Sequence, residues 1–293
     1  MDGRAWQVVA DGVSERYVRS ADGTRVGFLS QGRGPGLVLI QGAMGTAPHY
    51  SELAGCLGSH FTVHSLDRRG RGMSSHSYDA GHTVARDVED VDAVLAATGA
   101  SQVFGLSSGA MITLEAAKSL PRVTRAAVYE PPFYAEGISH DGIRQLNNDI
   151  DEGDLAAALV RSLLVAETAP APIRALPFPL ARLLARGVLW ADTHKPGPSA
   201  NLADLLPGIR YDFNVVGGMD GTMATFASLD KPMLLLSGTD SPDFLRQSIR
   251  TLEGVLPQAR HIEFEGLSHS GPWNRSRGGR PATVAVALSG FFN

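Results

Sequence analysis

The sequence is poor in cysteine, in net charge and in long apolar runs. Its single cysteine, Cys56, excludes an internal disulfide and a multi-thiolate zinc site among the 293 residues. The 26 lysines and arginines are nearly balanced by 30 aspartates and glutamates, leaving a formal net charge of −4. Without a basic excess we expect neither nucleic acid nor an anionic membrane as a partner. No apolar run approaches the ~20 residues of a membrane span.

Signals for targeting and for metal binding are also missing. Residues 1–4 are not followed by the apolar stretch of a signal peptide, which, with the low cysteine content, favours a cytoplasmic location. The nine histidines include no H-E-x-x-H pattern. We therefore expect neither a metal nor a cofactor.

The sequence does contain an alternation of short apolar runs with segments of helical period. The runs predict eight strands, at residues 16–20, 25–30, 36–41, 61–66, 102–106, 125–129, 232–237 and 261–264. The segments predict helices at residues 50–57, 83–98, 110–119, 243–255 and 280–292. This order predicts an α/β fold with a mostly parallel eight-stranded sheet and helices on both faces. An Asp22-Gly23 turn predicts an antiparallel hairpin of the first two strands at the sheet edge.

The alternation stops between residues 133 and 219, where the chain is helical and punctuated by proline. A segment of this length is not a bare loop, so we expect a helical cap inserted after the sixth strand. It would cover the carboxyl ends of the strands, where α/β sheets bind ligands, and leave a core of residues 1–132 and 220–293. The alternative is a helical extension without ligand contact. Trp190 is a candidate to bind a hydrophobic substrate, although the apolar cap residues would serve equally well for packing.

A G-x-S-x-G motif directly follows the fifth predicted strand, with Ser107 at its centre. The glycines on either side let the backbone bend sharply, and such a bend presents a serine Oγ above the sheet. Ser107 is therefore the candidate nucleophile. The alternative is a Gly-Ser loop without chemistry.

A second glycine-rich turn, from Gln41 to Thr46, follows the third predicted strand. Acyl transfer through a serine places negative charge on an oxygen, which two backbone N–H groups can stabilise. The expected pair comes from Ala43 and Ser108. Gln41 and Met44 are candidates to contact substrate from the same turn. Alternatively, the turn serves only to reverse the chain.

A serine nucleophile needs a base and an acid that orients the base. His269 is the candidate base, because it alone among the histidines lies in a loop after the last predicted strand. Two acids compete. Glu130 ends the sixth strand and Asp240 follows the seventh, and either gives the chain order serine, acid, histidine.

The motifs Q-G-A-M-G, L-D-R-R-G-R-G-M-S, G-L-S-S-G, Y-E-P-P and G-L-S-H, in this order, resemble those of α/β-hydrolases over nearly the full length. In particular, the sequence resembles bacterial enzymes of the esterase, lactonase and C–C hydrolase type. The resemblance implies Ser107 as nucleophile and His269 as base, with Ala43 and Ser108 as the oxyanion hole. It favours Glu130 over Asp240, because the aspartate of the common pattern falls at residue 241. It gives the loop from Asp67 an architectural role.

These features predict a serine hydrolase that cleaves a small hydrophobic or cyclic ester, lactone or thioester. A serine at this position disfavours the dehalogenases and epoxide hydrolases of the fold, which need a carboxylate there. Acyl transfer, C–C cleavage or lyase chemistry with the same triad is an alternative. A ligand-binding relative without activity is an alternative of another class.

Overall fold

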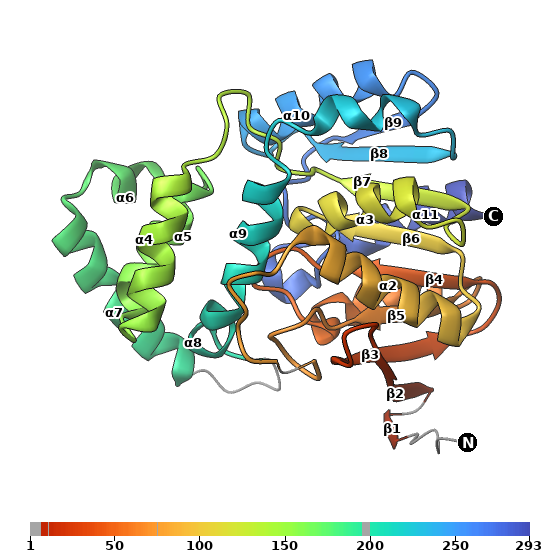
Figure 1. The fold of residues 1–293 in the computed structure, drawn as a ribbon, viewed down its shortest axis with the longest axis horizontal. Helices are drawn as coiled ribbons and strands as arrows, with labels where there is room; N and C mark the ends of the chain where they lie inside the picture. The colour runs from red at the N-terminus through yellow and green to blue at the C-terminus, as the bar shows by residue number, and fades with distance from the viewer. Residues whose placement is uncertain (1–6, 11, 75, 195–199) are drawn as a thin grey trace.

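A computed structural model describes residues 7–10, 12–74, 76–194 and 200–293. Residues 1–4, on which the expected absence of a signal peptide rests, lie outside this range. The described chain contains a sheet of nine strands in the order β1-β2-β3-β5-β4-β6-β7-β8-β9 (Figure 1). The strands are β1 (Gln7–Ala10), β2 (Val13–Arg19), β3 (Arg25–Gly32), β4 (Gly36–Ile40), β5 (Thr62–Leu66), β6 (Gln102–Leu106), β7 (Arg125–Tyr129), β8 (Met233–Gly238) and β9 (Arg260–Phe264).

The sheet is mostly parallel, as the sequence predicts. From β5 through β4, β6, β7 and β8 to β9 all neighbours are parallel, whereas β1, β2 and β3 pair antiparallel and β3 lies antiparallel to β5. The α/β fold is therefore confirmed, and each of the eight predicted strands overlaps an observed one.

The N-terminal edge of the sheet differs from the prediction. The hairpin of β2 and β3 is present, and the Asp22 side chain accepts a hydrogen bond from the Thr24 N–H in its turn, 2.9 Å away. However, β1 pairs with β2 and takes the edge position, so the sheet has nine strands. The sequence prediction missed this four-residue strand.

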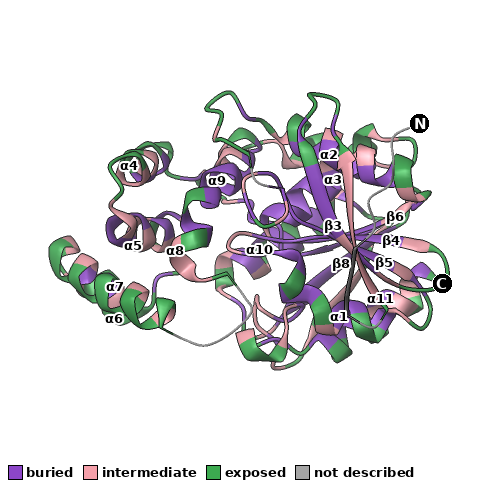
Figure 2. Ribbon diagram, turned by 90° about the horizontal axis from the view of Figure 1, so that it is seen from below, coloured by how far each residue is buried: buried purple, intermediate pink, exposed green. Residues whose placement is uncertain are grey.

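Helices cover both faces of the sheet (Figure 2). α2 (Val84–Thr98), α3 (Ser108–Ser119) and α10 (Asp243–Val255) pack on one face, and α1 (Ser51–Leu57) and α11 (Pro281–Phe292) on the other. Successive strand residues point to opposite faces, so Val38 and Ile40 join the first apolar cluster and Leu37 and Leu39 the second. Strands buried on both sides explain the continuous apolar runs of the sequence.

After β7 the chain leaves the sheet and forms helices beside the strand ends (Figure 1). These are α4 (His140–Asp151), α5 (Leu155–Val165), α6 (Ala171–Ala175), α7 (Phe178–Thr193), α8 (Leu202–Leu205) and α9 (Ile209–Gly218). α9 packs against α2 and α3 and shares their apolar cluster through Ile209 and Phe213. α7 instead packs mainly on α5 and α8, so it is held chiefly by the other helices of this segment.

His64, on β5, is a histidine that the fold keeps neutral. Its side chain is buried, and its Nδ1 lies 2.6 Å from Ser30 Oγ. Burial and, to a smaller extent, the positive charge of Arg16 lower the pKa of His64 to about 4. Below the ordinary histidine pKa of ~6.5, His64 is protonated in the unfolded chain but stays neutral in the folded protein. The free energy of unfolding therefore decreases as the pH is lowered from about 6.5 to about 4.

When the pH is lowered from 7 to about 4, the free energy of unfolding should decrease less in a His64→Asn variant than in the wild type. The difference between the two decreases should be on the order of 2 kcal/mol. Urea unfolding followed by circular dichroism across this range measures the difference. Ser30→Ala removes the hydrogen bond but keeps the buried ring, so it should retain the wild-type pH dependence. An unchanged pH dependence in His64→Asn would contradict the assignment.

Candidate active site

Ser107 occupies a sharp turn between β6 and α3. Its backbone has φ 57° and ψ −126°, a strained conformation for a residue with a Cβ. Two close approaches explain the flanking glycines. A Cβ on Gly105 would overlap the Gly109 carbonyl oxygen, and a Cβ on Gly109 would lie 2.5 Å from the carbonyl oxygens of Ile40 and Gln41. The two glycines of the G-x-S-x-G motif are therefore needed because the strand, the turn and the helix pack too closely for a Cβ at either position.

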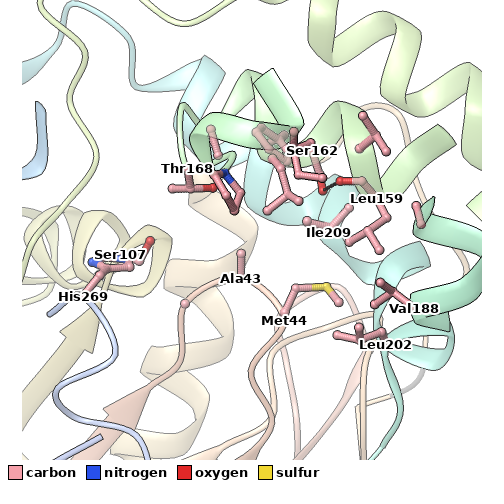
Figure 3. A pocket seen from close by; sticks show the side chains of 18 of the residues that line it. Ala43, Met44, Ser107, Leu159, Ser162, Thr168, Val188, Leu202, Ile209 and His269 are labelled. Carbon is pink, nitrogen blue, oxygen red and sulfur yellow. Dashed lines mark hydrogen bonds between the residues drawn. The ribbon is translucent and has the colours of Figure 1, made fainter. Parts of the chain in front are cut away.

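His269 and Glu130 form a hydrogen-bonded pair next to this turn. His269 Nδ1 lies 2.7 Å from Glu130 Oε2, and the other oxygen, Oε1, accepts the Gly238 N–H at 2.8 Å. The Glu130 side chain is fully buried, and its backbone is also strained, at φ 48°. Figure 3 shows Ser107 and His269 side by side at one end of a cavity that both line. The site thus brings together a serine, a histidine and a buried carboxylate.

Within the described chain, Asp240, the competing acid, forms no hydrogen bond with His269, whose Nδ1 contacts Glu130 instead. It is exposed, and its Oδ1 is 3.3 Å from the hydroxyl of the adjacent Thr239. Its N–H donates to the Leu267 carbonyl at 2.9 Å, which fixes the turn after β8 with the carboxylate directed to solvent. Of the two candidate acids, the structure places Glu130 on the histidine.

The two expected oxyanion donors come from segments in contact with Ser107. Ala43 lines the same cavity, and a Cβ on the preceding Gly42 would lie 2.8 Å from Ser107 Cβ. Ser108 is the first residue of α3, and the first N–H groups of a helix have no partner within it. Met44, at φ 58°, also lines the cavity.

A buried ionic cluster, which the sequence did not reveal, lies behind Ser108. Asp212, on α9, accepts hydrogen bonds from Ser108 Oγ at 2.6 Å and from Arg71 at 2.5 Å, and it also pairs with Arg68. Arg68 in turn donates to Ser108 Oγ at 3.0 Å and pairs with Asp87, on α2, at 3.0 Å. All of these side chains are buried. The cluster joins the inserted helices to the core at the residue after Ser107.

The charges of this cluster depend on one another. Burial would raise the pKa of Asp212, but the Arg71 and Arg68 guanidinium groups hold it below its usual range. Burial would likewise lower the pKa of Arg68, and Asp87 and Asp212 raise it instead. The loop that carries both arginines is therefore architectural, in agreement with the resemblance. Asp67 of the same loop accepts the N–H groups of Ala47 and Met73, at 2.5 and 2.9 Å.

The cavity beside Ser107 has a volume of about 510 Å³ and a mostly apolar wall. Figure 3 shows Ser107 and His269 at one end, with Met44, Val188 and Leu202 at the other. Apolar residues of α5, α7, α8 and α9 supply much of the lining, namely Leu159, Val160, Leu163, Ala181, Leu184, Ala185, Val188, Leu202, Ile209 and Phe213. Among the described lining residues, Arg277 is the one arginine or lysine.

Two of the predicted substrate contacts lie outside this lining. Gln41 is fully buried beneath the turn, and its side-chain amide has no hydrogen-bond partner among the described residues. Trp190 is 67% exposed and packs on His194. Leu184 and Val188, four residues apart, face the cavity from α7, and Trp190 is two residues further along, on the opposite side of the helix.

The structure adds Trp273 and Arg277 to the candidate site. Both lie in the irregular segment between β9 and α11, beyond His269, and both line the cavity. A loop residue has no periodic signal, so nothing in the sequence marked them. Within the described ranges, no group of three or more histidine, cysteine, aspartate or glutamate side chains is arranged to hold a metal. No helix in those ranges is long and apolar enough to cross a membrane.

Comparisons with known proteins agree with this geometry. The model of the alpha/beta hydrolase family matches residues 37–286. The crystal structure of an alpha/beta hydrolase from Sphaerobacter thermophilus is 31% identical, with a TM-score of 0.77, over 95% of this chain and 100% of that one.

Two further similarities concern deformylases. An N-formylmaleamate deformylase from Pseudomonas putida is 33% identical over 122 residues, which are 40% of this chain and 46% of the relative. The match therefore spans less than half of that curated relative. The crystal structure of an N-formylmaleamic acid deformylase from Pseudomonas putida has a TM-score of 0.62 at 20% identity, covering 93% of this chain and 99% of that one, and supports the fold.

We expect the two candidate acids to differ sharply when each is neutralised. Glu130→Gln should lower kcat on a p-nitrophenyl ester by about 10³-fold or more with little change in KM, because an amide cannot hold the same imidazole tautomer. Asp240→Asn should retain wild-type kcat, since this carboxylate faces solvent. Equal effects of the two changes would reject Glu130 as the orienting acid.

We expect Asp212→Asn to destabilise the protein by about 3 kcal/mol, because it leaves buried arginines without their counter-charge. The free energy of unfolding in urea measures the loss. Asp204→Asn is a matched control, since Asp204 is an exposed aspartate on neighbouring α8. If the two variants unfold at the same urea concentration, the cluster does not stabilise the fold.

Proposed function

Because the chain belongs to the α/β hydrolase family, we propose that it is a serine hydrolase that cleaves a small ester, lactone or thioester with a largely apolar acyl group. The observation that carries the proposal is the pairing of His269 with buried Glu130 beside the strained Ser107, at the end of one cavity. A structural serine needs neither the strain nor the buried acid, and strained backbone concentrates at functional sites.

In the proposed reaction, Ser107 Oγ attacks the carbonyl carbon while His269 Nε2 takes its proton. Glu130 accepts the hydrogen bond from His269 Nδ1, which fixes the tautomer and stabilises the imidazolium. The oxygen of the tetrahedral intermediate accepts hydrogen bonds from the N–H groups of Ala43 and Ser108. Two such donors in a cavity of low polarity lower the barrier by several kcal/mol.

His269 then gives the proton to the leaving oxygen or sulfur as the C–O or C–S bond breaks, which forms the alcohol or thiol. A water molecule, deprotonated by the same imidazole, attacks the acyl-enzyme, and the imidazolium returns the proton to Ser107 Oγ as the acid is released. The volume of about 510 Å³ suits a small molecule, and the apolar walls from α5 and α7 favour a hydrophobic acyl group.

Amide hydrolysis is a second candidate, favoured by the partial similarity to the deformylase. The same residues would act, with His269 protonating an amine instead of an alcohol. Rates on an ester and on the amide of the same acid distinguish the two activities. A higher kcat/KM for the amide would favour this candidate.

Incubation with a fluorophosphonate probe tests the nucleophile. We expect one adduct per chain, on the peptide that contains Ser107, and no labelling of Ser107→Ala. His269→Ala should be labelled far more slowly, because the serine loses its base.

Ser162→Ala is the matched control for this experiment, since it removes another hydroxyl from the same cavity and should be labelled like the wild type. A folded wild-type protein that stays unlabelled would overturn the proposed serine chemistry.

A further inference from the structure

Arg277 places a positive charge in the mostly apolar cavity. It ends the short 3-10 turn η4 (Arg275–Arg277), and it lines the same space as Ser107 and His269. Its guanidinium carbon lies 4.0 Å from the centre of the Trp273 ring, and its Nη1 is 2.8 Å from His49 Nε2. Two aromatic rings thus fix the orientation of this side chain.

No carboxylate of the described chain forms an ion pair with Arg277. The buried arginines Arg68, Arg69 and Arg71 differ, as does Arg275 in the same turn, because each has a carboxylate oxygen within 3.0 Å. Burial lowers the pKa of Arg277, and the more distant charge of Asp192 offsets this only in part. Asp192 itself accepts the Leu202 N–H at 2.6 Å. The guanidinium is therefore partly desolvated without a counter-charge in contact.

His49 does not supply that counter-charge. Its Nε2 lies 2.8 Å from Arg277 Nη1, and because a guanidinium can only donate, this imidazole nitrogen accepts the hydrogen bond. Burial and the Arg277 charge lower the pKa of His49 to about 4, which keeps the ring neutral at pH 7. The contact positions the guanidinium but does not neutralise its charge.

We propose that Arg277 binds a carboxylate of the substrate, so that the enzyme cleaves acyl compounds with an apolar body and a carboxylate group remote from the scissile bond. This inference rests on the proposed function. A guanidinium offers paired donors that match a carboxylate, and the pair is stronger in a cavity of low polarity than in water. The apolar walls contact the body of the molecule, and Arg277 selects its charged end.

The direct test compares two substrates of equal chain length, mono-p-nitrophenyl suberate and p-nitrophenyl octanoate. The first carries a carboxylate where the second carries a methyl group. Arg277→Gln should lower the ratio of their kcat/KM values by about 10-fold or more, because a charge-assisted hydrogen bond is lost. Arg277→Lys should retain part of the ratio, since it keeps the charge without the paired donors.

Arg275→Gln is the matched control. Arg275 lies in the same turn, but its side chain is 81% exposed and pairs with Glu52, so the ratio should stay at the wild-type value. If Arg277→Gln lowers both kcat/KM values equally, Arg277 serves only to pack Trp273, and the proposal is overturned. A ratio that does not change would overturn it as well.

A binding experiment separates this inference from the proposed reaction. Calorimetry on the Ser107→Ala protein should show tighter binding of monomethyl suberate than of dimethyl suberate, and Arg277→Gln in that background should abolish the difference. If fluorophosphonate labelling fails but this preference is found, the hydrolase proposal fails and the carboxylate site stands. If labelling succeeds and the two esters bind alike, the hydrolase stands and the carboxylate site is rejected.

Discussion

The geometry of the candidate active site depends on backbone strain at the ends of neighbouring parallel strands. Ser107 and Glu130 each follow their strand directly at positive φ, a conformation that costs about 1–3 kcal/mol per residue. The sheet holds both in place, because the Ser107 N–H donates to the Tyr129 carbonyl at 2.9 Å and the Glu130 N–H donates to the Leu236 carbonyl at 3.2 Å. The backbone hydrogen bonds between the strands thus continue one residue past the end of β6 and of β7. They place Ser107 and Glu130 next to each other at the same end of the sheet.

A second constraint joins the inserted helices to the chemistry. Asp212 connects α9 to Arg71 and to Ser108, whose N–H is an expected oxyanion donor. Because an unpaired buried charge is far more costly than a paired one, α9 can leave its place only if the ion pairs of Asp212 with Arg68 and Arg71 break together. The wall of the cavity and the turn after Ser107 are therefore held by the same interactions.

The arginines of the site region fall into two groups. Arg68 and Arg71 are neutralised by buried aspartates, so their charge is used in holding the fold. Arg277 stacks on Trp273 and faces a neutral His49, so its charge is directed to the cavity. In the sequence, the arginines of both groups lie in loops near glycines and look alike. The residues that contact them in the folded protein distinguish a structural role from the proposed binding role.

Local sequence patterns predicted eight of the nine strands, the main helices, the bend at Ser107 and the chain order of the candidate nucleophile and base. These features are local, since periodicity, glycine placement and chain order are read within short windows. Only the tertiary structure decided that Glu130 rather than Asp240 contacts His269, that Trp190 faces outward, and that Arg277 enters the cavity. Each of these depends on how a loop leaves the sheet and on which residues far along the chain pack against it, because contact across such separations leaves no local pattern.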